Sequence, residues 1–109
     1  MQNIQATATL TNNTTAATLF PAAAKSLNLL KVLTYHNTNA TATVINLRRG
    51  TTVLASFNAG ASMTAPVIID LTKWDLAWES GINQDINIIA VTTGANVIVN
   101  ALGEIKIRP

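Results

Sequence analysis

The sequence contains no cysteine, which excludes disulfide bonds, thiolate nucleophiles and cysteine-ligated metal sites together. It contains one histidine, His36, and a lone histidine beside an asparagine is more often a turn or surface residue than a catalytic base. No serine lies in a Gly-x-Ser-x-Gly elbow, and the five acidic residues match neither an EF-hand nor a His-Glu-x-x-His pattern. We therefore expect no catalytic residue, no metal site and no cofactor, in a protein that is not an enzyme.

Charged residues are also scarce, at 11% of the chain against roughly 25% in typical soluble domains. The seven basic residues are scattered along the chain, with only Arg48 and Arg49 adjacent, whereas a nucleic-acid-binding surface needs a basic stripe to neutralise phosphates. We therefore expect no nucleic-acid partner. A low charge content is typical of the cores of protein interfaces, and it favours the interpretation that much of this surface contacts other protein over a quirk of composition.

Long apolar runs are absent as well. The longest extend over about four residues, far fewer than the roughly 20 that a membrane-spanning helix requires. The first ten residues, "MQNIQATATL", show neither the basic n-region nor the apolar h-region of a signal peptide. We therefore expect no membrane partner and synthesis in the cytoplasm.

The feature that the sequence does have is a period-two alternation of apolar and polar residues. Over residues 4–11, Ile, Ala, Ala and Leu alternate with Gln and Thr, which indicates a half-buried strand. Residues 41–48 and 52–58 form the clearest hairpin, because Gly50 in their connection can adopt a positive φ. The side chains expected to face one another across this hairpin are Ile45 and Leu47 on the first strand and Val53, Ala55 and Phe57 on the second.

The chain as a whole predicts an all-β fold with about eight short strands at regular spacing, separated by turn signals. This pattern is typical of an antiparallel β-sandwich or a jelly roll. A length of 109 residues fits a single domain, in which residues 1–26 begin with a strand and residues 27–109 form the sandwich. One short helical turn is expected at residues 22–27, because Pro21 suits the first position of a helix. The five glycines are all expected at turns or at strand ends.

The stretch "LTKWDLAWESG", residues 71–81, holds both tryptophans of the chain. A strand over residues 73–79 would place Trp74 and Trp78 on the same face. A short helix capped by Thr72 would also place them on one face, at positions i and i+4. Periodicity does not separate the two interpretations, and the strand is favoured because the flanking segments are strand-like.

The functional meaning of the same stretch depends on its carboxylates and its aromatic rings. In a strand, Asp75 and Glu79 would be about 13 Å apart, too far for a glycosidase pair, whose carboxylates are about 5 to 9.5 Å apart. Aromatic side chains grouped in this way are usually core residues. For Trp74 and Trp78 we therefore favour core packing over a contact between subunits and over a sugar-stacking platform.

The segments "NTNATATVINLRRGTTVLASFNAGA" and "DLAWESGINQDINIIAVTTGANVIVNALGEIKI" resemble small β-sandwich structural proteins of tailed bacteriophages. The similarity is greatest to the capsid decoration, or cement, proteins, and it covers most of residues 28–108. The similarity lies in overall composition and pattern: a chain rich in threonine, asparagine and alanine, a hairpin with a glycine turn, the segment "GINQDINIIAV" that begins with glycine, and a last strand "VIVNAL". No individual functional residue is carried over from that group.

The resemblance implies a homo-oligomer, with a trimer favoured, that is made in the host cytoplasm and binds the major capsid protein on the surface of the virion. Residues 1–26, whose one charged residue is Lys25, would extend as an arm over a neighbouring subunit, and edge strands would be paired or covered in the assembly. Two alternatives remain open. One is a phage tail, fibre or receptor-binding module, and the other is a carbohydrate-binding module that uses Trp74 and Trp78.

Overall fold

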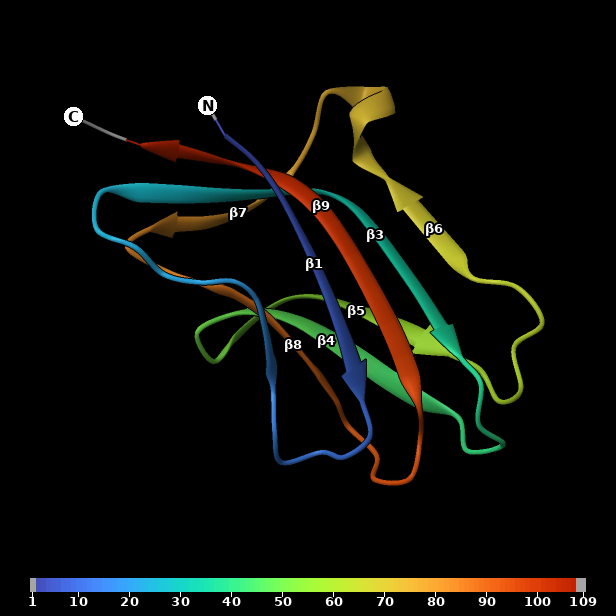
Figure 1. Cartoon of the computed structure of the whole chain (residues 1–109). Helices are drawn as coiled ribbons and strands as arrows, with labels where there is room; N and C mark the ends of the chain where they lie inside the picture. Colours follow the sequence, from blue (N-terminus) through green and yellow to red (C-terminus); the bar gives the residue numbers. More distant parts are fainter. Residues whose placement is uncertain (1, 108–109) are drawn as a thin grey trace.

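The computed structural model describes residues 2–107. Two antiparallel sheets pack face to face (Figure 1), which confirms the predicted all-β sandwich. The five-stranded sheet has the order β1-β9-β3-β6, with β7 also paired to β3, and the four-stranded sheet has the order β2-β8-β4-β5. The strands are β1 (Gln2–Leu10), β2 (Ala17–Phe20), β3 (Ser26–Asn37), β4 (Thr43–Arg49), β5 (Thr52–Ala59), β6 (Val67–Asp70), β7 (Trp78–Ile82), β8 (Ile86–Ala90) and β9 (Val97–Ile107).

The strand order is that of a jelly roll, in which late strands of the chain pair with early ones. The first strand, β1, pairs with the last, β9, and β2 pairs with β8. In the centre of the two sheets, β3 joins β9 to β6 and β7, and β4 joins β8 to β5. The loops β1–β2, β3–β4, β5–β6 and β8–β9 therefore lie at one end of the sandwich, and the loops β2–β3, β4–β5 and β7–β8 lie at the other (Figure 1).

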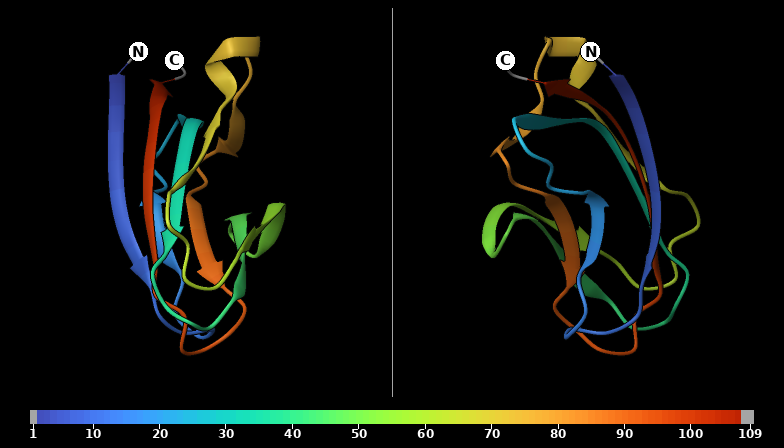
Figure 2. Two further views of the ribbon diagram at one scale, coloured as in Figure 1. Left: turned by 90° about the vertical axis from the view of Figure 1, so that its right-hand side faces the viewer. Right: turned by 60° about the vertical axis from the view of Figure 1, so that its left-hand side comes forward.

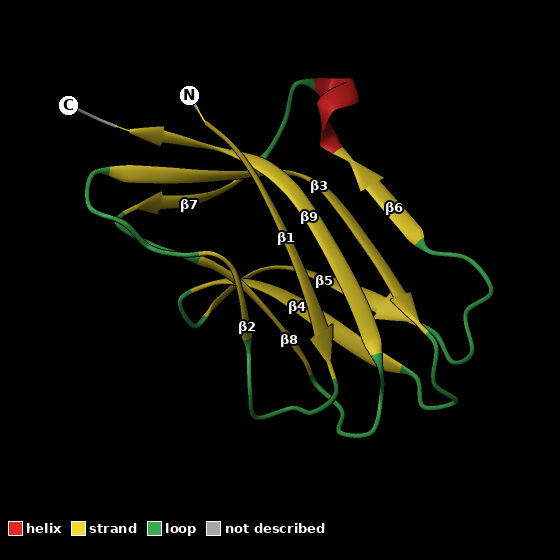
Figure 3. Ribbon diagram, viewed as in Figure 1, coloured by secondary structure: helices red, strands yellow, loops and turns green. Residues whose placement is uncertain are grey.

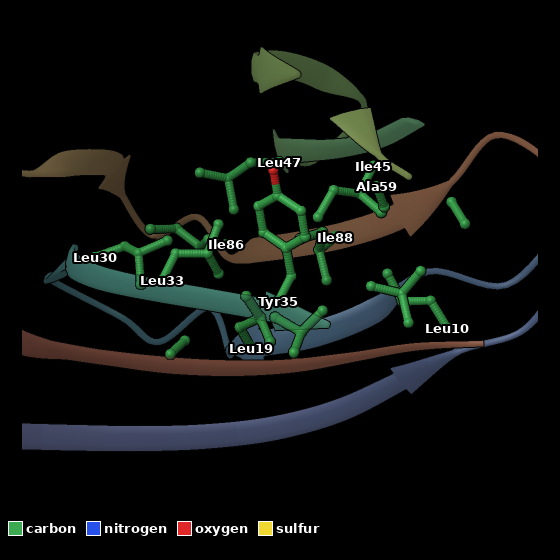
Figure 4. Packing of buried hydrophobic residues seen from close by; sticks show 14 of the residues in the cluster. Leu10, Leu19, Leu30, Leu33, Tyr35, Ile45, Leu47, Ala59, Ile86 and Ile88 are labelled. Atoms are coloured by element: carbon green, nitrogen blue, oxygen red, sulfur yellow. The ribbon is translucent and has the colours of Figure 1, made fainter. Parts of the chain in front are cut away.

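The core lies between the two sheets, because alternation along each strand directs every second side chain inward. In β9, for example, Val97 and Val99 are buried while Ile98 between them is exposed. Figure 4 shows inward side chains of both sheets meeting, with Leu33 and Tyr35 from one sheet and Ile88 from the other. The buried cluster consists of Leu10, Leu19, Phe20, Leu30, Leu33, Tyr35, Ile45, Leu47, Ala59, Ile86, Ile88, Ala90, Ala95, Val97, Val99 and Ala101.

The hairpin predicted around Gly50 is confirmed as β4–β5, and Gly50 has a φ of 57°. Ile45 pairs with Phe57 and Leu47 pairs with Ala55, as expected. The predicted partner set is wrong for Val53, which pairs with Arg48 because the register shifts at a bulge in β5.

The helical turn predicted at residues 22–27 is wrong. Residues 21–25 connect β2 to β3 with a turn at residues 24 and 25, which the backbone N–H of Ser26 closes by donating to the carbonyl of Ala23 at 3.2 Å. Ser26 already pairs with Ile107 of β9, so the residues that a helix would need belong to the sheet. Within residues 2–107 the helical turn lies elsewhere, in the 3-10 helix η1 (Leu71–Trp74), drawn in red in Figure 3.

The N-terminal segment, for which the resemblance implied an arm, forms sheet structure within its own chain. β1 pairs with β9 along its whole length, from Gln2 opposite Ile105 to Leu10 opposite Val97. β2 follows in the other sheet, paired with β8. Residue 1 lies outside the described range.

Gly103 was expected at a turn or strand end and lies instead inside β9. A Cβ atom at this position would overlap the carbonyl oxygen of Leu29 in β3 and would lie 2.8 Å from the ring of Phe20. β3 has a bulge beside this point, at Lys31. The glycine therefore permits two backbones to approach closely, a role that glycine takes inside strands.

Candidate interaction surfaces

The tryptophan-containing stretch interrupts one edge of the five-stranded sheet. β6 pairs with residues 32–35 of β3 and β7 pairs with residues 27–30, so the two strands are successive pieces of the same edge. Residues 71–77 leave the sheet between them, as η1 and a turn (Figure 3). The strand predicted over residues 73–79 is therefore wrong for residues 73–77. The alternation of apolar residues that suggested a strand continues through these residues, although no neighbouring strand pairs with them.

Hydrogen bonds from Thr72 to the carboxylate of Asp70 fix the start of η1. The hydroxyl of Thr72 and its backbone N–H, the latter at 3.0 Å, both donate to Oδ1 of Asp70. These bonds favour the ionised carboxylate and hold the pKa of Asp70 below its ordinary value. The cap is thus Asp70, where the helical interpretation had placed Thr72. The helix is capped at its end by Asp75, the residue after Trp74, which has a φ of 53° and donates its N–H to the carbonyl of Thr72.

The two tryptophans have different environments, and the prediction that both pack in the core is wrong for Trp74. Trp74 ends η1 and is 68% exposed. Trp78 is half-buried in β7 and packs edge to face against Phe57 of β5, with 5.6 Å between ring centroids. The ring centroid of Phe57 also lies 6.0 Å from that of Tyr35. The hydroxyl of Tyr35 donates to the carbonyl of Asn58 at 2.9 Å. Burial raises the pKa of Tyr35. The residues proposed as one sugar platform are thus divided between a surface position and an aromatic cluster that joins the two sheets.

The two carboxylates of the stretch line a hollow of about 430 Å³ and do not belong to one strand. Asp75 lies in the turn after η1 and Glu79 lies in β7. The same hollow is lined by Lys31 and Glu104, which form a salt bridge of 2.9 Å, and by Lys106. Both basic and acidic side chains therefore line it.

Part of the outer face of the five-stranded sheet is broad and almost uncharged, whereas Lys31, Glu104 and Lys106 lie on the same face toward the charged hollow. The side chains that alternate with core residues form rows across β1, β9, β3 and β6. We call three adjacent rows the neutral face; they are Gln5, Leu102, Val32 and Asp70, then Thr7, Asn100, Thr34 and Ile68, then Thr9, Ile98 and His36. The charged member is Asp70, at the margin. Thr7 donates a hydrogen bond to Asn100 across the strands at 2.9 Å, so hydroxyl and amide groups are interspersed with exposed aliphatic side chains.

The charged residues gather at one end of the molecule, although they are scattered in the sequence. Within residues 2–107 they lie toward the loops β2–β3, β4–β5 and β7–β8 and around η1. This end carries six basic and five acidic residues, since Arg108 is outside the described range. The loops of the opposite end, residues 11–16, 38–42, 60–66 and 91–96, contain no charged residue. Backbone hydrogen bonds join them, for example from Gly94 to Thr11 at 3.1 Å, so the uncharged end is a connected surface.

The described residues contain no group of three or more His, Cys, Asp or Glu side chains that could hold a metal ion. His36 lies on the neutral face, where its Nε2 is 2.8 Å from the carbonyl oxygen of Met63. Among residues 2–107 no helix has the length and apolar character needed to cross a membrane.

No protein-family model and no curated protein matches this chain. Among solved structures, the chain is similar to one in "Structure of infectious bursal disease virus Gx strain", with 12% sequence identity and a TM-score of 0.26. The similarity covers 99% of this chain and 38% of the viral chain, so this chain spans less than half the length of that neighbour. A TM-score this low does not establish a shared fold.

Proposed function

We propose that this protein is a non-enzymatic structural protein of a virion that assembles with other protein subunits through its neutral face. The observation that carries the proposal is the neutral face itself, an area up to four strands wide whose charged member, Asp70, lies at its margin. Proteins that remain free in solution keep charges of both signs dispersed over their surface, whereas the centres of interfaces are depleted in charge. The jelly roll occurs in viral capsid domains and in lectins, so the fold is compatible with this role and the face supplies the argument.

The narrower role that we propose is that of a capsid decoration protein. As an oligomer it binds the major capsid protein on the outer surface of the shell and stabilises the contacts between neighbouring capsid subunits. Exposed aliphatic side chains such as Ile98 and Leu102 are buried against the shell, and the threonine and asparagine groups between them form hydrogen bonds with it. Many shallow contacts of this kind add up to a stable attachment without any deep pocket.

The sequence also left two other functions open. A tail, fibre or receptor-binding module would use the same uncharged surfaces and differs only in the virion protein that it contacts. A carbohydrate-binding module based on two tryptophans needs both rings on one exposed surface, and Trp78 packs against Phe57 while Trp74 is exposed.

Co-sedimentation with empty shells, assembled from the major capsid protein of the same virus, tests the proposal. We expect the unmodified protein to sediment with the shells. Asn100→Lys places a charge in the centre of the neutral face at an exposed residue, and it is expected to weaken binding at least about tenfold. The matched control is Ser56→Lys, an exposed residue on the outer face of the four-stranded sheet, which is expected to bind like the unmodified protein.

Two results would overturn the proposal. If the unmodified protein binds neither shells nor purified tails of that virus, it is not a structural protein of this virion. If it binds shells and Asn100→Lys binds equally well, the neutral face is not the attachment surface. Binding to tails and not to shells would replace the decoration role with the tail role.

A further inference from the structure

We propose that the free edge of β1 pairs antiparallel with β1 of a second copy of this chain, so that two five-stranded sheets become one continuous sheet across a two-fold axis. β1 is the outermost strand of its sheet, and in the left view of Figure 2 it stands at the outer side of the sandwich with no other strand beyond it. Every second residue of such a strand directs its backbone N–H and C=O groups away from β9, toward the free edge. Unpaired backbone groups in a row form a template for another strand.

The other edges of the sandwich, within residues 2–107, each have a feature that hinders strand addition. β6 and β7 are separated by η1, and this edge carries Asp70, Lys73 and Glu79. β2 has only four residues with a register shift, and Pro21 follows it. β5 has a bulge at Leu54, because Val53 pairs with Arg48 while Ala55 pairs with Leu47. Interruptions, short strands, bulges, prolines and charges are the means by which natural sheets avoid edge-to-edge pairing.

β1 has none of these features. Its nine residues pair with β9 in an unbroken register, and they include no charged residue and no proline. A long, regular and uncharged edge is therefore present on one side of the sandwich only. This asymmetry indicates that the β1 edge is covered by another chain and that the remaining edges are not.

Side-chain burial along β1 supports the same conclusion. Ile4, Ala6 and Ala8 point toward the core yet are only partly buried. At the same level of the neighbouring strand, Val99 and Ala101 have no exposed surface. The difference arises because β1 has a neighbour on one side only, and a second strand at its free edge would complete the burial.

The occupant is a second copy because the strand is complementary to itself. In an antiparallel pair centred near Ala6, Gln5 lies opposite Thr7 of the second copy, and Ile4 lies opposite Ala8 of the second copy. Polar side chains thus meet polar ones on the outer face and apolar side chains meet apolar ones on the inner face. No like charges are brought together, since the strand has none.

The expected interface is small. At about 3.3 Å per residue the nine-residue edge is about 30 Å long, and with a molecular thickness of 18 Å it covers about 500 Å² per copy. Roughly 1,000 Å² in total is at the low end for specific interfaces. We therefore expect a dimer that dissociates on dilution in the micromolar range.

This inference concerns the protein alone and does not require attachment to a shell, so it can fail while the proposed function stands. A self-paired edge has two-fold symmetry and gives a dimer. The trimer implied by the resemblance would need a different contact, with unlike surfaces meeting around a three-fold axis. Native mass separates the two arrangements directly.

The experiment measures the native mass of the full chain, without shells, over a range of concentrations. Gln5→Lys with Thr7→Lys places lysines opposite each other twice across the two-fold axis and is expected to raise the dimer Kd at least about tenfold. Gln5→Glu with Thr7→Lys makes the same two positions attractive, because each glutamate then faces a lysine of the other copy, and is expected to restore the dimer. The matched control, Ser56→Lys with Asn58→Lys, adds the same charges at two exposed residues of the β5 edge and is expected to leave the dimer unchanged.

Each alternative result contradicts the inference. A chain that is monomeric at all concentrations has no β1 pairing, and a trimer that survives the two lysines is built on another contact. A lysine pair that dissociates the dimer without rescue by the glutamate–lysine pair would exclude antiparallel self-pairing. Circular dichroism and thermal unfolding show whether every variant is folded, which is expected because the four substituted residues are exposed.

Discussion

The two edges of the five-stranded sheet are built differently. The β1 edge is uncharged, and its register is regular over nine residues. The opposite edge is broken into β6 and β7, and between them residues 71–77 project from the sheet with Trp74 exposed (Figure 1). One edge is suited to pairing with another strand, and the other edge prevents it.

The irregularity at the broken edge does not extend across the whole sheet. β3 is bulged at Lys31, opposite the gap between β6 and β7, and its backbone at Leu29 comes close to Gly103 in β9. The next strand, β1, pairs with β9 without any shift of register. β9 therefore separates a distorted half of the sheet from a regular half, and Gly103 is the residue at which the distortion is accommodated.

Gly103→Ala is expected to have the largest effect, because it removes this accommodation. The added methyl group would overlap the carbonyl oxygen of Leu29 and press on the ring of Phe20. Overpacking of this kind costs about 3 kcal/mol, measured as a loss in the free energy of unfolding in urea. Gly60→Ala is the control, since no atom lies within 4 Å of the added group, and it should change stability by less than about 0.5 kcal/mol. Equal stability of both variants would contradict the role assigned to Gly103.

A second prediction compares the tryptophans on the two sides of the interruption. Trp78→Ala removes the edge-to-face contact with Phe57, and for a half-buried ring the loss should be about 2 kcal/mol, below the 3–5 kcal/mol of fully buried rings. Trp74→Ala should stay within about 0.5 kcal/mol of the unmodified protein, since Trp74 is 68% exposed. Urea unfolding of the two variants provides the measurement. A larger loss for Trp74→Ala would mean that the projection, and not the aromatic cluster, stabilises this edge.

The strands and the hairpin at Gly50 could be predicted from sequence because alternation and turn residues are local signals. The interruption after β6 could not, because the alternation at Trp74, Leu76 and Trp78 is the same whether or not a partner strand is present. Gly103 was misassigned for a related reason. The sequence does not distinguish a glycine that permits the close approach of a distant strand from a glycine in a turn.

The sequence predicted that the candidate surfaces would be poor in charge, and it did not predict where on the molecule they lie. The low charge content indicated protein contacts, but the sequence intersperses its charged residues between uncharged segments such as 32–47 and 86–103. Only the jelly-roll connectivity brings the uncharged loops to one end and the charged residues to the other. The neutral face likewise exists because β1, β9, β3 and β6, distant in sequence, lie side by side.

The smallest expected effect concerns the cap that begins the interruption. Because the pKa of Asp70 is lowered in the folded protein by the hydrogen bonds from Thr72, its stabilising contribution is present above the unfolded value of 3.8 and is lost as the pH falls through the lowered folded value. Asp70→Asn should therefore be less stable than the unmodified protein at pH 7, by less than Trp78→Ala, and the difference should shrink as the pH falls below 3.8. Thr72→Val removes the hydroxyl donor, and NMR titration should show the pKa of Asp70 rising toward its ordinary value. An unchanged pKa in Thr72→Val would mean that this hydroxyl does not stabilise the ionised carboxylate of Asp70, and would contradict the contribution assigned to it in the cap.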